Sequence, residues 1–217
     1  MTQNLTKDLK LYLIRHGRTQ WNDQGLMQGW GNSDLTEDGV KGARLTGDAL
    51  ANIPFQAAYS SCLQRTIDTA QYILGNRDVP LFQHIGLNEQ FFGSWEGVHI
   101  DTIRHTAEFK QMINEPARYQ ALTNGGETWR QLTERAMKAI EDIIRVHDEG
   151  NLLLVSHGHT VRLLMALFGG ATWQNHREEG KSVSMSNTSI NIVRYRQQGE
   201  NKGVFTVERL NDVRHLG

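Results

Sequence analysis

Two histidines, each followed by a glycine, end the two most apolar strand-like segments of the chain. Residues 9–14 lead into Arg15-His16-Gly17, and residues 152–155 lead into Ser156-His157-Gly158. In open parallel sheets, ligands bind outside the carboxyl ends of the strands. If the two strands are neighbours, both imidazoles face one crevice. Each glycine then allows a sharp turn and a close approach of a ligand to the backbone.

Imidazole side chains in this setting can act as nucleophiles, bases or metal ligands, and a guanidinium beside one of them adds a group that binds anions. A neutral imidazole is a nucleophile that can form a covalent intermediate and so divide a transfer into two steps. A phosphomonoester dianion needs positive charge around its oxygens, and the guanidinium of Arg15 binds two oxygens at once while staying charged. A single His-Gly pair most often belongs to an ordinary strand-end loop. Two pairs on equivalent strands, one of them beside an arginine, favour a shared site.

Several further blocks of sequence accompany the two His-Gly pairs. In chain order they are residues 15–22 (RHGRTQWN), 28–30 (QGW), 34–39 (DLTEDG), 59–66 (YSSCLQRT), 87–89 (LNE), 92–97 (FGSWEG), 125–128 (GGET) and 155–158 (VSHG). In these blocks the chain resembles the histidine phosphatase superfamily, which includes the cofactor-dependent phosphoglycerate mutases. The resemblance implies an α/β three-layer sandwich, with a mostly parallel central sheet and helices on both faces.

The resemblance also implies roles for particular side chains. The catalytic set that it implies is Arg15, His16, Arg65, Glu89 and His157. The substrate-binding set that it implies is Arg15, Asn22, Gln28, Gly29, Arg65 and His157. No metal or other cofactor is expected. His16 matches the family's nucleophile, and the adjacent cations should lower its pKa and keep the ring neutral. His157 matches the second histidine, which steadies the phosphoryl group in transfer.

A carboxyl group is needed to protonate the leaving alkoxide and then to activate water, and one group can do both in turn. Glu89 matches that family role by position, and we expect it on a loop at the mouth of the crevice. Asp68, within a helix, and Glu96, in a Trp-Glu-Gly turn, are weaker candidates. Arg18 departs from the signature, where the family usually has an acid or an amide, and this leaves substrate preference open.

The choice between phosphatase and mutase depends on residues 89–93. Family mutases carry E-R-x-Y-G there, whereas this chain has E-Q-F-F-G, with Gln90 in place of the arginine, and a short insertion before Gly125. Both differences favour a phosphatase. Its expected partners are small phosphorylated metabolites and inorganic phosphate. A 2,3-bisphosphoglycerate-dependent phosphoglycerate mutase is the alternative. The aromatic residues of 84–127 either line a wide apolar pocket or pack in the core.

Three other classes of protein fit these residues less well. A metal-dependent hydrolase could use His16, Glu89, His157 and His159, but no H-E-x-x-H motif or acidic cluster supports it, and the arginines would repel a cation. Cysteine phosphatase chemistry needs an arginine six residues after the cysteine. Cys62 lacks one, so we expect a small apolar filler there. A non-catalytic binding module conflicts with the full set of charged side chains.

The elements that must position these residues alternate between strands and helices. Predicted strands are residues 9–14, 57–60, 79–83 and 152–155, with residues 190–196 and 204–210 as a terminal hairpin or edge pair. Predicted helices follow the caps Thr36 and Thr128, or span residues 63–74 and 161–168. Gly75 and Gly150 are predicted to end helices. We expect one domain, residues 1–217, with a partly helical insertion or cap at 84–127 over one edge.

Composition excludes several functions. The 217 residues contain 23 Lys and Arg against 24 Asp and Glu, a net charge of −1, which argues against a nucleic-acid-binding face. One cysteine excludes an internal disulfide framework. The longest apolar run, residues 163–168, is far too short for a membrane span, and the polar residues 1–10 carry no secretory signal. We therefore expect a soluble cytoplasmic protein without a membrane partner, either monomeric or a homodimer.

Overall fold

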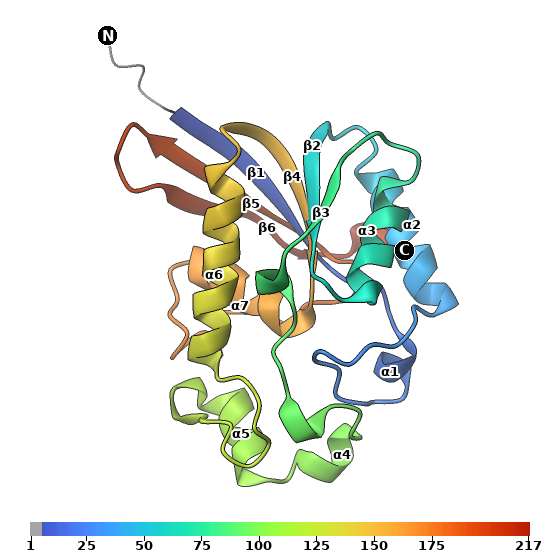
Figure 1. Cartoon of the computed structure of the whole chain (residues 1–217), viewed down its shortest axis with the longest axis vertical. Coiled ribbons are helices and arrows are strands. Elements are labelled where there is room, and N and C mark those ends of the chain that lie inside the picture. Colours follow the sequence, from blue (N-terminus) through green and yellow to red (C-terminus); the bar gives the residue numbers. More distant parts are fainter. Residues whose placement is uncertain (1–5) are drawn as a thin grey trace.

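A six-stranded sheet, with strands in the order β3-β2-β4-β1-β5-β6, forms the centre of the computed structural model, which describes residues 6–217 (Figure 1). The strands are β1 (Thr6–Arg15), β2 (Phe55–Ser60), β3 (Leu81–Gln83), β4 (Glu149–Ser156), β5 (Ile190–Gln198) and β6 (Val204–Asp212). The first four are parallel, whereas β5 and β6 add an antiparallel pair beside β1. The mostly parallel sheet and the terminal hairpin are confirmed.

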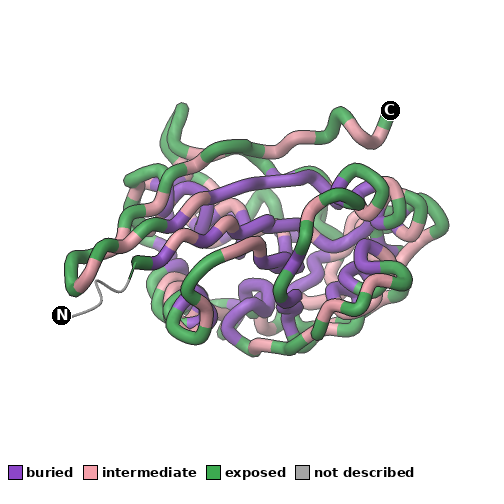
Figure 2. The backbone as a smooth tube through the Cα atoms, turned by 90° about the horizontal axis from the view of Figure 1, so that it is seen from above, coloured by how far each residue is buried: buried purple, intermediate pink, exposed green. Residues whose placement is uncertain are grey.

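Helices cover both faces of this sheet. α2 (Glu37–Ala49) and α3 (Gln64–Leu74) lie on one face, and α6 (Trp129–Arg145) and α7 (Gly158–Phe168) lie on the other (Figure 1). Alternate side chains of β1 serve the two faces, since Leu11 packs with the α6 and α7 cluster and Tyr12 with the other. Buried residues concentrate in the central layer (Figure 2), which confirms the three-layer sandwich.

Local sequence explains most helix ends. The side chains of Thr36 and Thr128 accept hydrogen bonds from backbone N–H groups in the first turns of α2 and α6, so both predicted N-caps are confirmed. α3 ends before Gly75, as expected. The prediction that Gly150 ends α6 is wrong. The helix stops at Arg145, because β4 already pairs with β1 from Glu149 onward.

Residues 84–127 lie beyond the carboxyl ends of the strands rather than along the edge strand β3 (Figure 1). They contain α4 (Ile100–Ile103), α5 (Ala107–Asn114) and 3-10 turns at Ile85–Leu87, Gly93–Trp95 and Pro116–Arg118. The aromatic side chains of Trp95, Phe109 and Tyr119 are buried in a cluster with the start of α6. They pack in a core, and only Phe92 of the buried aromatics in this cluster reaches the cavity described below. No helix within residues 6–217 is long and apolar enough to span a bilayer.

Candidate active site

The two His-Gly pairs meet because β1 and β4 are adjacent and in register. Arg15 pairs with Ser156, and the backbone N–H of His16 donates to the Ser156 carbonyl at 2.9 Å. The rings of His16 and His157 then lie edge to face, with 5.2 Å between their centroids. The expectation that both histidines share one location is confirmed. A Cβ on Gly17 would lie 2.6 Å from the Gly39 carbonyl oxygen, so this glycine admits α2 rather than a ligand.

His16 is buried, and its hydrogen bond defines its tautomer. Nδ1 lies 2.7 Å from the carbonyl oxygen of Gly17, which can only accept, so Nδ1 carries the proton and Nε2 keeps its lone pair. Burial, followed by the charges of Arg65 and Arg15, holds the pKa of His16 well below its ordinary value. The ring is therefore a neutral base with a free Nε2 at neutral pH.

Two guanidinium groups flank His16, that of Arg15 half-buried and that of Arg65 fully buried. Arg15 donates from Nη1 to the Met185 carbonyl at 2.7 Å. Arg65, fully buried on the first turn of α3, donates from Nη2 to Gly29 O at 2.6 Å and from Nη1 to Gly31 O at 2.8 Å. The Nε atoms of both arginines are buried and have no hydrogen-bond partner in residues 6–217. Burial lowers the pKa of Arg65 to about 10, so it stays charged at neutral pH.

His157 is the N-cap residue of α7, and it is fully buried. Its Nε2 lies 2.8 Å from Ser61 Oγ, while its Nδ1 is buried without a hydrogen-bond partner in the described chain. Burial, with the nearby charge of Arg65, holds its pKa well below the ordinary value. His157 is thus a neutral, hydrogen-bonding group beside His16.

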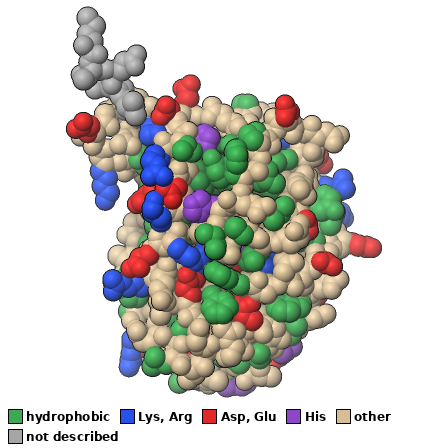
Figure 3. Space-filling view, in the orientation of Figure 1, with side chains coloured by type: hydrophobic (Ala, Val, Ile, Leu, Met, Phe, Trp, Pro, Cys, Tyr) green, Lys and Arg blue, Asp and Glu red, His purple; other side chains and the backbone are tan. Residues whose placement is uncertain are grey.

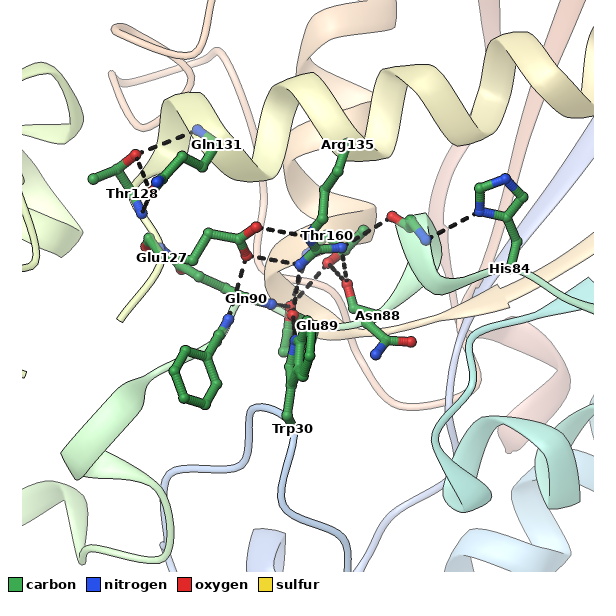
Figure 4. Close-up of polar contacts among 12 residues, drawn as sticks. Trp30, His84, Asn88, Glu89, Gln90, Glu127, Thr128, Gln131, Arg135 and Thr160 are labelled. Atoms are coloured by element: carbon green, nitrogen blue, oxygen red, sulfur yellow. Dashed lines mark hydrogen bonds and ion pairs between the residues drawn. The ribbon is translucent and has the colours of Figure 1, made fainter. Parts of the chain in front are cut away.

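Glu89 lies on a loop after the Ile85–Leu87 turn, as expected, and it is buried. Oε1 accepts three hydrogen bonds, from Gln90 N, Thr160 N and Thr160 Oγ1 (Figure 4). The single donor to Oε2 in the described chain is the N–H of His159, at 2.9 Å. A carboxylate oxygen has two lone pairs, so Oε2 keeps one that is free for a ligand or a proton.

Arg135 of α6 positions the Glu89 loop, and the sequence did not reveal it. Its guanidinium donates to the carbonyl oxygens of Gly86, Asn88 and Glu89 at 3.0, 2.8 and 2.6 Å, and it pairs with the Glu127 carboxylate at 2.6 Å (Figure 4). In the sequence, Arg135 is one of several charged residues on the polar face of a helix. Only the fold brings three loop carbonyls to it.

The loop before α2 carries two more of the predicted binding residues. Asn22 lies in α1 (Gln20–Asp23), and its Oδ1 accepts from Thr19 N and from Asn187 Nδ2, so Nδ2 is the end that can donate to a ligand. Both ends of the Gln28 amide are engaged within the loop. Oε1 accepts from Thr19 Oγ1 at 2.7 Å, and Nε2 donates to Ser33 Oγ at 3.0 Å.

Gly29 has a structural position, because its carbonyl holds Arg65 and a Cβ there would collide with the Glu96 carboxylate. Glu96 accepts from the backbone N–H groups of Trp30, Gly31 and Phe92, so it ties the loop to the 84–127 segment. The expectation that Glu96 is structural agrees with these bonds. Asp68 accepts from Gln64 on the exposed side of α3.

A cavity of about 230 Å³ opens over His16. Its lining residues are Arg15, His16, Asn22, Leu26, Met27, Gln28, Glu89, Phe92, Gly158, His159, Arg162, Arg177, Ser184 and Met185. Arg65 and His157 lie beside His16 but do not line the cavity, and neither does Gly29. Most of the lining side chains are polar or charged, and Phe92 is the one aromatic residue of 84–127 among them, which favours core packing over an apolar pocket for these aromatic residues.

Metal-ligating groups are not clustered here. Among residues 6–217, no three His, Cys, Asp or Glu side chains lie close enough together to hold a metal ion. Two ring nitrogens here already have hydrogen-bond partners: His157 Nε2 contacts Ser61 Oγ, and His159 Nδ1 contacts Gln90 Oε1.

Comparison with known proteins identifies the family. The model of the histidine phosphatase superfamily (branch 1) matches residues 11–212. The chain belongs to this superfamily. The adenosylcobalamin/alpha-ribazole phosphatase of Salmonella typhimurium is 33% identical over 178 residues, 79% of this chain and 87% of that protein. A 2,3-bisphosphoglycerate-dependent phosphoglycerate mutase of Bartonella quintana is 35% identical over 167 residues, 73% of this chain and 81% of that protein. The structure of Bacillus stearothermophilus YhfR has a TM-score of 0.85 at 33% identity, covering 96% of this chain and all of that one.

Two residues that stood out in the sequence of this histidine phosphatase do not line the cavity over His16, although Arg18 lines a neighbouring hollow that shares Arg15 and Asn22 with it. Arg18, the departure from the signature, is half exposed and forms an ion pair with Asp23. Cys62 is exposed, so the expectation of a buried apolar filler is wrong. Its position follows from the loop before α3, where its backbone N–H donates to the Asn88 side chain and its thiol faces outward.

Proposed function

We propose that the chain hydrolyses small phosphomonoesters through a phosphohistidine formed on His16. The observation that carries this proposal is the unprotonated Nε2 of His16, held between two guanidinium groups that each have an unpaired buried Nε. Glu89, whose Oε2 keeps a free lone pair, lines the same cavity. A nucleophile, cationic donors and a carboxyl group are the parts that stepwise phosphoryl transfer requires.

The first step transfers the phosphoryl group to the protein. The Nε2 lone pair of His16 attacks phosphorus, the P–O bond to the alcohol breaks, and the carboxyl group of Glu89 gives its proton to the leaving oxygen. The second step reverses these roles. The Glu89 carboxylate takes a proton from water, the water oxygen attacks phosphorus, and the P–N electron pair returns to Nε2. Arg15 donates to the phosphoryl oxygens from the cavity wall. Arg65 and a protonated Nδ1 of His157, both buried beside His16, add charge and a donor as the phosphoryl group moves onto Nε2 and leaves it again.

Asn22 extends this proposed pocket. Its Nδ2 donor lies in the cavity wall, and the engaged amide of Gln28 fixes the loop that carries it. Gly29 contributes by holding Arg65 through its carbonyl. The role proposed for Gly29 is therefore indirect.

Gln90 supports hydrolysis over mutase activity. Its Nε2 donates to the Glu127 carbonyl at 2.8 Å, and its Oε1 lies 2.7 Å from His159 Nδ1. A neutral amide, tied on both sides, thus occupies the position where the family's mutases carry an arginine. The mutase relative keeps 2,3-bisphosphoglycerate-dependent exchange as the alternative.

Domain organisation, location and partners complete the proposed function. We take residues 1–217 as one domain in which residues 84–127 form a cap over the site, acting in the cytoplasm on small substrates. The buried cluster shared by that segment, α6 and α7 supports a single unit. On the face seen in Figure 3, acidic and basic side chains are interspersed, and the net charge is −1, which supports a partner other than nucleic acid.

Trapping the intermediate tests this function. Parent protein mixed with a phosphomonoester should acquire an acid-labile, base-stable phosphoryl group and release inorganic phosphate. His16→Ala should lose both, whereas His105→Gln, which changes an exposed histidine, should keep both. Turnover by His16→Ala would overturn the mechanism. If bisphosphoglycerate-dependent exchange exceeds hydrolysis in the parent, the mutase alternative holds.

A further inference from the structure

A second group of positive charge lines the active-site cavity and takes no part in the chemistry described above. Arg162, on α7, and Arg177, in the segment after α7, both line the cavity that contains His16 and Arg15. Neither forms an ion pair with an acidic side chain in residues 6–217. The one acidic residue in the cavity lining is Glu89, which already accepts four hydrogen bonds.

Arg177 is held in place mainly by a ring. Its guanidinium carbon lies 4.9 Å from the centroid of Trp129, a cation–π geometry that orients the flat group. Nε and Nη2 are buried and have no hydrogen-bond partner in the described chain. Burial lowers the pKa of Arg177 to about 9, with a further contribution from Arg162, so the group is still charged at neutral pH. A largely enclosed cation that has no ion-pair partner among the described residues destabilises the free protein, and an anion in the cavity would relieve it.

Arg162 is fixed at one nitrogen and free at the others. Its Nε donates to Ser182 Oγ at 2.7 Å, and that hydroxyl donates to the carbonyl of His176 at 2.6 Å. These bonds orient the guanidinium. Its two Nη groups donate to no described residue, so both can donate to a ligand. Two oriented guanidinium groups in one small cavity form a site for a planar or tetrahedral oxyanion.

We propose that Arg162 and Arg177 form a second anion subsite, so that the preferred substrates are small phosphomonoesters whose leaving alcohol carries a carboxylate or a second phosphate. This inference rests on the proposed phosphatase function, and it names the substrate class of that site. The cavity that holds both arginines has a volume of about 230 Å³, which suits a small leaving group. It shares Arg15, Asn22, Leu26 and Met27 with a neighbouring hollow of about 350 Å³. Arg15, which precedes His16 in the chain, lines the same cavity and holds the reacting phosphate in the proposed mechanism.

Matched pairs of substrates test the subsite. O-Phosphoserine differs from O-phosphoethanolamine, and 3-phosphoglycerate from glycerol 3-phosphate, in carrying a carboxylate. Ethylene glycol bisphosphate differs from 2-hydroxyethyl phosphate by a second phosphate. We expect kcat/KM to be at least tenfold higher for the anionic member of the carboxylate pairs, of the bisphosphate pair, or of both. Which pairs show the preference identifies the anion.

Variants assign the preference to the two arginines. Arg177→Gln and Arg162→Gln should each bring the anionic-to-neutral ratio of kcat/KM at least fivefold closer to one. Arg130→Gln, which removes an exposed arginine paired with Glu134, should leave the ratio unchanged. Because the ratio compares two substrates on one protein, a general loss of active protein does not mimic the result. Thermal melting identifies a variant that fails to fold, and Arg177→Lys then replaces Arg177→Gln.

The outcomes separate the two proposals. A ratio near one in the parent, with p-nitrophenyl phosphate hydrolysed, overturns the subsite and leaves the phosphatase function standing. If the parent hydrolyses no phosphomonoester, the proposed function fails, and calorimetry with the same pairs measures the subsite directly. In that case a tenfold lower Kd for the anionic member supports it, and equal Kd values overturn it.

Discussion

Replacing Glu89 by glutamine should separate proton donation from every other contribution to the site. Oε1 of Glu89 accepts three hydrogen bonds and Oε2 accepts one from His159 N at 2.9 Å. The glutamine oxygen must therefore take the Oε1 position, which places its NH2 group against the N–H of His159. Two donors then face each other, and we expect a loss of about 1–3 kcal/mol in the free energy of unfolding.

The kinetic effect should depend on the leaving group. General acid catalysis contributes about 10²–10⁴-fold, or roughly 3–5 kcal/mol at 1.36 kcal/mol per tenfold. Glu89→Gln should lose that factor with alkyl phosphates, whose alkoxide needs a proton. Phosphorylation by p-nitrophenyl phosphate should lose less than tenfold, because nitrophenolate leaves without one. Hydrolysis of the phosphoenzyme then limits turnover, since no base activates water.

Rapid mixing measures both steps. We expect Glu89→Gln to give a burst of nitrophenol equal to the active-site concentration, followed by slow turnover, with a labelled phosphoenzyme present during that phase. A matched control is Glu134→Gln, an exposed carboxylate of α6 in an ion pair with Arg130. Equal slowing of alkyl and aryl phosphorylation, without a burst, would refute the assignment of Glu89 as the acid, because a merely structural defect affects both substrates alike.

Three further outcomes follow from the geometry. Arg65→Ala should lower kcat/KM about a hundredfold or more, the range for one lost donor to a transition-state oxyanion. Arg118→Ala, which removes an exposed arginine, should leave kcat/KM unchanged. A drop below tenfold for Arg65→Ala would contradict its place in the phosphate site. Burial lowers the pKa of His176 from 6.5 to about 4, so between those values the unfolded chain binds a proton that the folded chain excludes, and the free energy of unfolding falls by about 1.36 kcal/mol per pH unit as the pH drops. Urea titrations between pH 7 and 4.5 give the free energy of unfolding at each pH. Its fall per pH unit should be smaller by that amount in His176→Asn than in the parent, and an unchanged pH dependence would disprove the burial argument. Gly29→Ala should lower the free energy of unfolding by about 1–3 kcal/mol, because a Cβ there meets the Glu96 carboxylate and lies 2.6 Å from the Gln90 carbonyl oxygen. Gly169→Ala, where the nearest atoms lie at 3.4 Å or more, should change the free energy of unfolding far less. Similar urea midpoints for the two variants would count against the packing argument.

Most helices and strands, and the two histidines of the site, could be predicted from local sequence patterns. Periodic apolar residues and hydroxyl caps act over a few positions of chain, so Thr36 and Thr128 could be identified as helix starts without any tertiary information. The repeated His-Gly ends placed His16 and His157 together, because the carboxyl ends of neighbouring parallel strands share an edge. The roles of Glu89 and Arg65 were predicted from the resemblance of the ordered motifs to the family, because residue spacing alone does not indicate them.

The surroundings of those residues depend on how distant segments pack and could not be predicted from local patterns. Arg135, Arg162 and Arg177 look like ordinary charged residues in the sequence, yet packing brings the first to the Glu89 loop and the other two into the cavity. The tautomer of His16 follows from one backbone carbonyl, and the early end of α6 follows from strand pairing with β1. These features depend on contacts between segments far apart in the chain. Local propensity carries no information about such contacts, because burial and hydrogen-bond partners exist only once the layers have packed.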